Sequence, residues 1–222
     1  MAVERAVLTD LGAIDDPFAE RMLDPTMARI LWGVRHHIPV SLRRRSVTLA
    51  GLAARVRWHD DQARVAIDDG VDQVVIVGAG YDSRAWRLAR LGVRWFELDH
   101  PATQADKAVR SPAGGPTFVP ADLRHDSAVD VLVAGGLSLD RPSLFVLEGL
   151  TMYLPEVDVR RLLGDLASAA PGSRLSTDFY PRPDAGSARN RRQDQLQRLA
   201  WKFLIPVALA NIVVTAILKV VF

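Results

Sequence analysis

Apolar runs alternate with amphipathic stretches from residue 70 onward, and this rhythm predicts alternating strands and helices. The apolar runs, several of them rich in β-branched residues, predict strands over 73–77, 93–98, 117–119, 143–147 and 173–179. Helical periodicity between them predicts helices over 82–91, 101–110, 126–134 and 155–169. Strands that alternate with helices pair in parallel through right-handed crossovers, so the pattern predicts a doubly wound, mostly parallel α/β sheet.

The part of the chain before this alternation has a helical pattern. Residues 1–40 predict helices that are broken at Asp16-Pro17 and Asp24-Pro25, and residues 41–69 predict a longer helical region with a loose apolar face. We therefore expect one domain with three parts, an N-terminal helical cap, an α/β core and an atypical C-terminal segment, which cover 1–69, 70–180 and 181–222.

The C-terminal segment 203–222, FLIPVALANIVVTAILKVVF, carries one charge, Lys219, and follows a basic stretch. An apolar run of this length with a basic flank is typical of a helix that spans a membrane. Residues 194–219 also resemble the last helix of the membrane subunit of NADH–quinone oxidoreductase. The alternative is a buried or interfacial helix, because Asn211, Thr215 and Lys219 fall four residues apart on one stripe. The sequence leaves both open.

The amino-acid composition excludes several kinds of functional site. The 222 residues include no cysteine, which excludes disulfides, thiolate metal sites and cysteine nucleophiles. The formal net charge is only +2, and no region has the basic, aromatic-rich composition of nucleic-acid binding. His36, His37 and His100 lack a third ligand at suitable spacing, so we expect no metal. The start, MAVERAVLTDLGAIDD, has acids and no apolar signal region, which predicts a cytoplasmic protein.

The stretch VVIVGAGYDSR, residues 74–84, places two glycines directly after the first predicted strand. Gly78 and Gly80 allow a positive φ and a close approach of a ligand to the backbone. The dinucleotide fingerprint requires a third glycine where this chain has Ser83, and the chain contains no Gly-Lys-Ser/Thr run of the phosphate-binding loop. Asp82 would repel a bound phosphate. The turn therefore favours a ligand without phosphate.

Acidic residues end the next two predicted strands. Glu97 and Asp99 end the second strand, where a carboxylate is placed to accept hydrogen bonds from ribose hydroxyls. Asp122 follows the third strand and is placed to accept from an adenine amino group, beside the backbone amide and apolar side chain of Leu123. These acids favour a phosphate-free nucleoside with a cationic or zwitterionic tail. S-adenosylmethionine fits that description better than NAD, and a Rossmann oxidoreductase is the disfavoured alternative.

Four motifs in order, VVIVGAGYDSRAWRL, FELDHP, VPADLR and LEGLTMYLP, resemble the leucine carboxyl methyltransferase family. The resemblance is closest to its actinobacterial branch of S-adenosyl-L-methionine-dependent methyltransferases, which also resembles polyketide O-methyltransferases. It covers about residues 50–180 and implies a class I methyltransferase fold, Rossmann-like, with S-adenosyl-L-methionine over the strand ends. The implied activity is O-methylation of a carboxylate or hydroxyl on a small molecule.

The same resemblance implies roles for single residues. The glycines face the methionine part of the cofactor, and Asp99 binds ribose. Arg55, or Arg57 as the alternative, pairs with the cofactor carboxylate, which a planar guanidinium grips bidentately. Glu148 is the implied catalytic residue, near the transferred methyl group; for a phenol or enol acceptor, Glu148 or His100 would be the base. The complete set of implied cofactor-binding residues is Arg55, Gly78, Ala79, Gly80, Asp82, Glu97, Asp99, Asp122 and Leu123.

The chain departs from the family after residue 180, where the family sheet ends in an antiparallel strand pair and shapes the acceptor pocket. Two alternatives follow from this departure. One is a cofactor-binding but catalytically inactive chain that acts as a scaffold or binding protein. The other is a methyltransferase anchored to a membrane through 203–222 that acts on a lipid-like acceptor. The expected partner is a small-molecule acceptor, with no nucleic acid, and a homodimer is left open.

Overall fold

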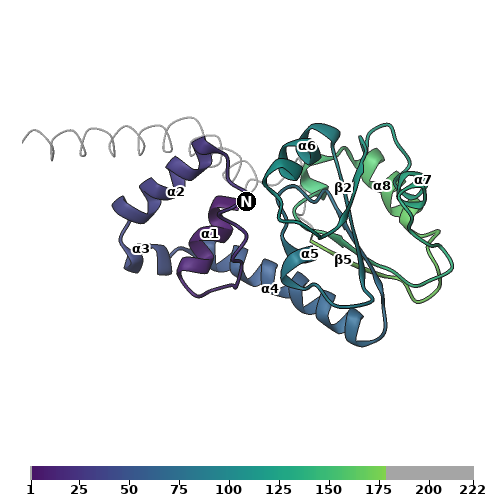
Figure 1. Ribbon diagram of the computed structural model, residues 1–222, viewed down its shortest axis with the longest axis horizontal. Helices are drawn as coiled ribbons and strands as arrows, with labels where there is room; N and C mark the ends of the chain where they lie inside the picture. Colours follow the sequence, from purple (N-terminus) through teal and green to yellow (C-terminus); the bar gives the residue numbers. More distant parts are fainter. Residues whose placement is uncertain (1, 179–222) are drawn as a thin grey trace, which may run out of the picture. The chain divides into compact units, whose positions relative to one another are not determined.

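The computed structural model describes residues 2–178 (Figure 1). Met1 and residues 179–222 lie outside the described residues, and with them lies the predicted apolar segment 203–222. Residues 2–178 belong to one compact unit. Within the described range, no helix is both long enough and apolar enough to cross a bilayer.

The N-terminal region contains helices, and the expected break at Asp24-Pro25 is confirmed. The expected break at Asp16-Pro17 is too late, because the first helix ends at Asp10 and no helix covers 11–24. Asp24 caps the second helix by accepting a hydrogen bond from Met27 N at 2.8 Å, and Pro25 occupies the first helical position. The predicted region 41–69 is divided in two, because Ser46 caps a new helix. The four helices are α1 (Ala2–Asp10), α2 (Pro25–His37), α3 (Val40–Arg44) and α4 (Val47–Asp68).

Five parallel strands form one sheet in the order β3-β2-β1-β4-β5. This topology confirms the predicted doubly wound parallel sheet. The chain order reverses between β1 and β4, and such a switch point is where open α/β sheets bind ligands. The strands are β1 (Gln73–Val77), β2 (Arg94–Asp99), β3 (Thr117–Pro120), β4 (Leu144–Leu147) and β5 (Arg174–Thr177).

Helices cover both faces of the sheet, because every residue of β1 is buried and successive side chains point to opposite faces. On one face, Ala66 of α4 belongs to the same apolar cluster as Ile76. On the other face, Leu132 of α7 and Leu162 of α8 cluster with Val77. The remaining helices are α5 (Arg84–Arg87), α6 (Pro101–Arg110), α7 (Ala128–Ala134), the 3-10 turn η1 (Thr151–Tyr153) and α8 (Glu156–Leu166).

The helix predicted over 82–91 is wrong in length, since α5 spans only Arg84–Arg87. Its start is delayed because the Asp82 carboxylate accepts a hydrogen bond from Arg84 N at 2.7 Å and forms a local turn. Its end comes at Leu88, whose φ of −110° and ψ of 19° leave the helical range. The short helix keeps the side chain of Arg84 buried behind the end of β1.

Candidate functional site

The turn after β1 requires glycine at two positions. Gly78 and Gly80 have φ values of +67° and +48°, which side chains rarely tolerate. A Cβ atom on Gly78 would lie 2.6 Å from Cδ1 of Leu150. Gly78 N donates to the carbonyl oxygen of Leu98 at 2.7 Å, which ties the turn to the end of β2. The predicted turn is therefore tied to the end of β2 and closed by Leu150 at Gly78, while Gly80 has no atom within 4 Å of its Cβ position.

Asp99 is held in place at the end of β2 by the same turn. Its Oδ2 atom accepts a hydrogen bond from Gly80 N at 2.5 Å, and its Oδ1 atom accepts one from His100 N at 2.6 Å. An ionised carboxylate has about four acceptor positions, so both oxygens retain capacity for a ligand hydroxyl. The backbone thus orients Asp99 without using up its acceptors.

A cavity of about 350 Å³, here called the strand-end cavity, lies at the carboxyl ends of β1, β2 and β4. This volume falls in the range of small-molecule sites. Its lining carries three carboxylates, from Asp82, Asp99 and Glu148, against one guanidinium, from Arg5. Such a lining attracts positive charge and repels a polyphosphate. The other lining residues are Ile76, Gly78, Ala79, Gly80, Tyr81, Gly149, Leu150 and Tyr153.

Behind the strand-end cavity, the fully buried Arg84 binds three carboxylates. Its Nε, Nη1 and Nη2 atoms donate to Asp60, Asp82 and Glu148 at 2.6, 2.5 and 2.6 Å, respectively. Burial raises the pKa of Asp82, but the positive charges of Arg84 and Arg5 outweigh this and hold the pKa well below its ordinary value. Asp82 is therefore ionised at neutral pH.

Glu148 has each carboxylate oxygen on a different arginine. Oε2 accepts from Arg84, and Oε1 accepts from Arg55 Nε at 3.1 Å. Burial raises the pKa of Glu148, yet the charge of Arg84, together with that of Arg5, leaves the pKa below its ordinary value. Glu148 is thus a fixed negative charge that faces the strand-end cavity.

A buried cluster of charges joins the first helix to α4 and α5. Arg5 Nε lies 2.8 Å from Asp16 Oδ2, and Arg5 Nη2 donates to Ser83 Oγ at 2.8 Å. Arg87 Nη1 donates to Asp60 Oδ2 at 2.7 Å. Sequence reasoning missed Arg5, Arg84 and Asp60 because nothing in a local pattern reveals their partners. The one available signal was the Ser-Arg pair that ends the glycine-turn stretch.

The structure places Glu97 away from the strand-end cavity, unlike Asp99. Glu97 and Lys107 of α6 are both fully buried, and Nζ of Lys107 lies 2.5 Å from Oε2 of Glu97. Burial raises the pKa of Glu97 to about 7, although the Lys107 charge opposes this shift. Glu97 and Asp99 lie on the same side of β2, but α6 covers Glu97 and leaves Asp99 at the cavity.

Three further residues implied as cofactor contacts also lie outside the lining of the strand-end cavity. Besides Glu148, Arg55 faces Asp178, with its Nη1 atom 3.5 Å from Oδ2. Asp122 accepts hydrogen bonds from the backbone N–H and the guanidinium of Arg124. Leu123 packs against the apolar core.

His100, the other base candidate, is also absent from that lining. It is exposed and accepts from Ala102 N at the start of α6. The structure thus brings together Gly78, Ala79, Gly80, Asp82, Asp99 and Glu148 of the predicted set.

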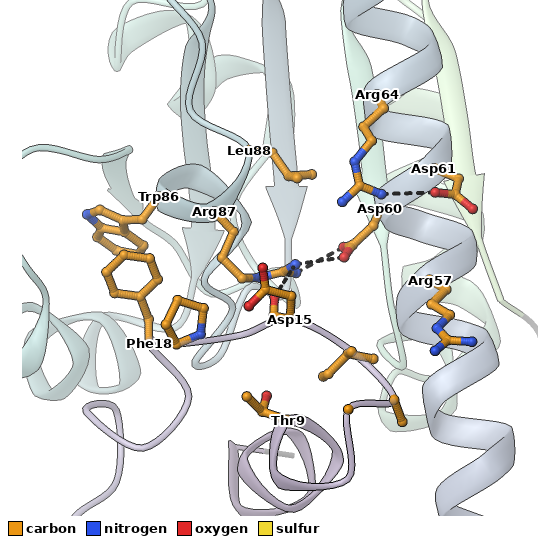
Figure 2. Close-up of a pocket in the computed structure, with 14 residues that line it drawn as sticks. Thr9, Asp15, Phe18, Arg57, Asp60, Asp61, Arg64, Trp86, Arg87 and Leu88 are labelled. Carbon is orange, nitrogen blue, oxygen red and sulfur yellow. Dashed lines mark hydrogen bonds and ion pairs between the residues drawn. The ribbon is translucent and has the colours of Figure 1, made fainter.

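A second cavity, of about 810 Å³, lies between residues 9–18, α4 and α5 (Figure 2). Figure 2 shows Phe18 and Trp86 on one side of it, with ring centroids 6.4 Å apart, and the Arg87–Asp60 ion pair on another. Asp60 also binds Arg84, which binds Glu148. The two cavities are therefore linked by a continuous chain of buried ion pairs.

The family model and the relatives that match this chain are all described as methyltransferases. A family model described as leucine carboxyl methyltransferase matches residues 1–167. A protein of Mycobacterium sp. (strain JLS) named "Putative S-adenosyl-L-methionine-dependent methyltransferase" is 35% identical over 225 residues, which cover 91% of this chain and 72% of the relative. A protein of the same name from Mycobacterium avium (strain 104) is 34% identical over 203 residues, covering 82% of this chain and 65% of the relative.

Each of these matches covers only part of the relative's own length. A third relative, from Parafrankia sp. (strain EAN1pec), is 42% identical over 137 residues, covering 58% of this chain and 44% of that protein. Among solved structures, magnesium protoporphyrin IX methyltransferase from Synechocystis PCC 6803 with bound SAH is 19% identical. That comparison covers 68% of this chain and 67% of that chain, with a TM-score of 0.43.

Proposed function

The chain belongs to the leucine carboxyl methyltransferase family, and from this premise we propose that it is an S-adenosyl-L-methionine-dependent methyltransferase that methylates a carboxylate oxygen of a small molecule. The observation that carries the proposal is the strand-end cavity, where three carboxylates and a glycine turn face a space sized for a small ligand. A sulfonium nucleoside carries positive charge and no phosphate, so it matches this lining. A dinucleotide does not.

The residues of the strand-end cavity suit the parts of this cofactor. Asp99 retains acceptor capacity for the two ribose hydroxyls, and Gly80, where a Cβ atom would meet nothing within 4 Å, leaves room for the methionine part. Glu148 offers a fixed negative charge to the cofactor's cationic groups. Arg5 is the guanidinium in the lining and is a candidate for the cofactor carboxylate, a role that the family resemblance assigns to Arg55.

The acceptor class is supported by the absence of a suitable base from the described lining of the strand-end cavity. No histidine lines the strand-end cavity among residues 2–178, and both Glu148 and Asp82 have lowered pKa values. When bound, S-adenosyl-L-methionine supplies an electrophilic methyl group for an in-line attack. A carboxylate is already an anionic nucleophile and needs no proton removed, whereas a hydroxyl does. The residues of the site therefore position and shield the reactants.

Isothermal titration with S-adenosylhomocysteine and with NADH tests the cofactor assignment. We expect saturable binding of S-adenosylhomocysteine and none of NADH. Asp99→Asn should weaken S-adenosylhomocysteine binding about tenfold or more, because hydrogen bonds to a charged acceptor are strong. Asp140→Asn is the matched control, because Asp140 is exposed and does not line the strand-end cavity. This variant should bind S-adenosylhomocysteine with the affinity of the wild type.

Turnover requires a separate measurement. A panel of small carboxylic acids and phenols, assayed with radiolabelled S-adenosyl-L-methionine, should give methyl esters and no aryl ethers. Binding of NADH in place of S-adenosylhomocysteine would overturn the cofactor assignment. Methylation of phenols with no methylation of any acid would overturn the acceptor class alone.

A further inference from the structure

A third cavity, of about 380 Å³, lies among the N-terminal helices, and we call it the cap cavity. It shares no lining residue with the strand-end cavity. Three arginines line it, and no acidic residue of the described chain does. Its complete lining is Leu8, Leu11, Ala13, Arg43, Arg44, Ser46, Leu49, Ala50, Ala53, Ala54 and Arg57. The cap cavity is thus basic and otherwise almost entirely apolar.

The positive charge of the cap cavity is poorly compensated. Arg57 contrasts with its neighbours in Figure 2, where Arg64 pairs with Asp61 and Arg87 pairs with Asp60. Within residues 2–178, neither the Arg57 nor the Arg44 guanidinium has an ion pair or a side-chain hydrogen bond; both residues are exposed and free to receive a ligand.

The third arginine of the cap cavity is buried and only partly satisfied. Arg43 is 8% exposed, and its Nε atom donates to the carbonyl oxygen of Ile38 at 3.2 Å. Its Nη1 atom makes no hydrogen bond and lies 3.8 Å from Asp10 Oδ2, a carboxylate that Arg35 already binds at 2.8 Å. Arg43 therefore adds a positive charge to the wall that its one nearby acid does not fully balance.

The start of α4 adds to this positive field. Ser46 caps the helix, and its hydroxyl accepts a hydrogen bond from Leu49 N at 3.3 Å. A helix N-terminus carries a partial positive charge, and α4 is 22 residues long. Both the helix end and the arginines thus favour an anion.

The floor of the cap cavity is made of apolar side chains. Leu8 and Ala53 are buried, and Leu49 packs against both in one apolar cluster. An inorganic anion would gain nothing from this floor, whereas an apolar tail would bury surface against it. We propose that the cap cavity binds a small amphipathic carboxylate, with its head group at Arg44 and Arg57 and its apolar body on this floor.

Titration with octanoate, followed by calorimetry on the full-length protein, tests the proposal. Octanol keeps the chain without the charge, and acetate keeps the charge without the chain. We expect saturable octanoate binding at one site and at least tenfold weaker binding of the other two, because each lacks half of the recognition. Octanol binding as tight as octanoate, or no saturable octanoate binding, would overturn the proposal.

Substitutions of the lining arginines test whether octanoate binds in the cap cavity. Arg44→Gln and Arg57→Gln should each weaken octanoate binding about tenfold, as expected for loss of a charge-assisted hydrogen bond. The matched controls are Arg45→Gln, which changes the exposed neighbour of Arg44, and Arg64→Gln, which changes an exposed arginine of α4 that lines only the second cavity. Neither control should change the affinity.

Filling the cap cavity gives an independent readout. Ala50 is exposed on α4 and lines the cap cavity, so Ala50→Phe should occupy the space and abolish octanoate binding with circular dichroism unchanged. Unaltered octanoate binding in this variant would contradict the assignment. S-adenosylhomocysteine binding should persist in all four arginine variants and in Ala50→Phe. Failure of the proposed carboxylate site in the cap cavity can therefore be distinguished from failure of the proposed methyl transfer.

Discussion

Two carboxylates of the strand-end cavity, Asp99 and Glu148, are suited to different roles because their hydrogen-bond partners differ. Asp99 is oriented by two backbone N–H groups and keeps free acceptor positions, so it is suited to hydroxyls. Glu148 is bound by two arginines and stays ionised, so it is suited to a positive charge and is a weak base. The resemblance implied catalysis for Glu148, and its pairing makes electrostatic positioning the better description of the proposed role.

Titration of Glu148 tests this pairing. The charge of Arg84 lowers the pKa of this carboxyl despite the opposing effect of burial, so its carbon-13 NMR signal should titrate below the ordinary value of 4.5. The signal is assigned by its absence in Glu148→Gln. A transition near neutral pH would contradict the pairing and restore Glu148 as a candidate base.

Residue positions in the strand-end cavity were predictable from the sequence only where the fold places a residue by its position on a strand. Gly78 directly follows β1 and Asp99 ends β2, so locating the strands located them. Arg5 and Arg84 bind partners that come from other elements, and no local pattern specifies such pairs. Glu97 has the correct strand and side, but the covering Lys107 could be recognised only after α6 was placed.

At the scale of elements, the glycine turn is joined to the end of β2 by backbone and side-chain hydrogen bonds. All five strands were predictable because buried parallel strands are short apolar runs, and all lie within two residues of their expected bounds. The helix over 82–91 was not, because Asp82 and Arg84 form a local turn that competes with helical hydrogen bonds.

Alanine substitutions at two glycines test the turn. Gly78→Ala places a Cβ at positive φ, close to Leu150, and should lower the free energy of unfolding by about 1–2 kcal/mol. Gly51→Ala lies inside α4 with nothing within 4 Å of its Cβ, and should raise that free energy by roughly 0.5–1 kcal/mol. Urea denaturation measures both. Equal effects of the same sign would refute the strained turn.

At the scale of the whole described molecule, the buried ion cluster joins the N-terminal helices to the α/β core. Arg5 comes from α1, Asp60 from α4, and Arg84 from the segment after β1. The sequence predicted a helical cap over 1–69 and a core over 70–180, but it gave no indication that charges hold the two together. Fully buried charges are costly to leave unpaired, so the cluster makes the cap and core interdependent.

Adjacent aspartates on α4 test this interdependence. Asp60→Asn removes a buried charge shared by Arg84 and Arg87, and should lower the free energy of unfolding by about 3–5 kcal/mol. Asp61→Asn removes only an exposed pair with Arg64, and should cost less than about 1 kcal/mol. Similar costs at the two positions would show that the cluster contributes little.

The same cluster sets the response of stability to acid. The pKa values of Asp60 and Glu148 are lowered in the folded state, from ordinary values of 3.8 and 4.5. Groups with lowered pKa values stabilise the fold above their ordinary values, and this stabilisation is lost as the pH falls through the folded values. The free energy of unfolding should therefore decrease below about pH 4.5, and less steeply in Asp60→Asn. An equal slope in both proteins would exclude Asp60 as a contributor.

The most direct test of the proposed function is a crystal structure of the full-length chain with S-adenosylhomocysteine. The nucleoside should lie in the strand-end cavity, with ribose hydroxyls donating to the Asp99 carboxylate at about 2.5–3.0 Å. Glu148 should face the amino-acid part or the sulfur of the ligand. A nucleoside bound elsewhere, or an Asp99 carboxylate turned away from the ribose, would contradict the cofactor assignment.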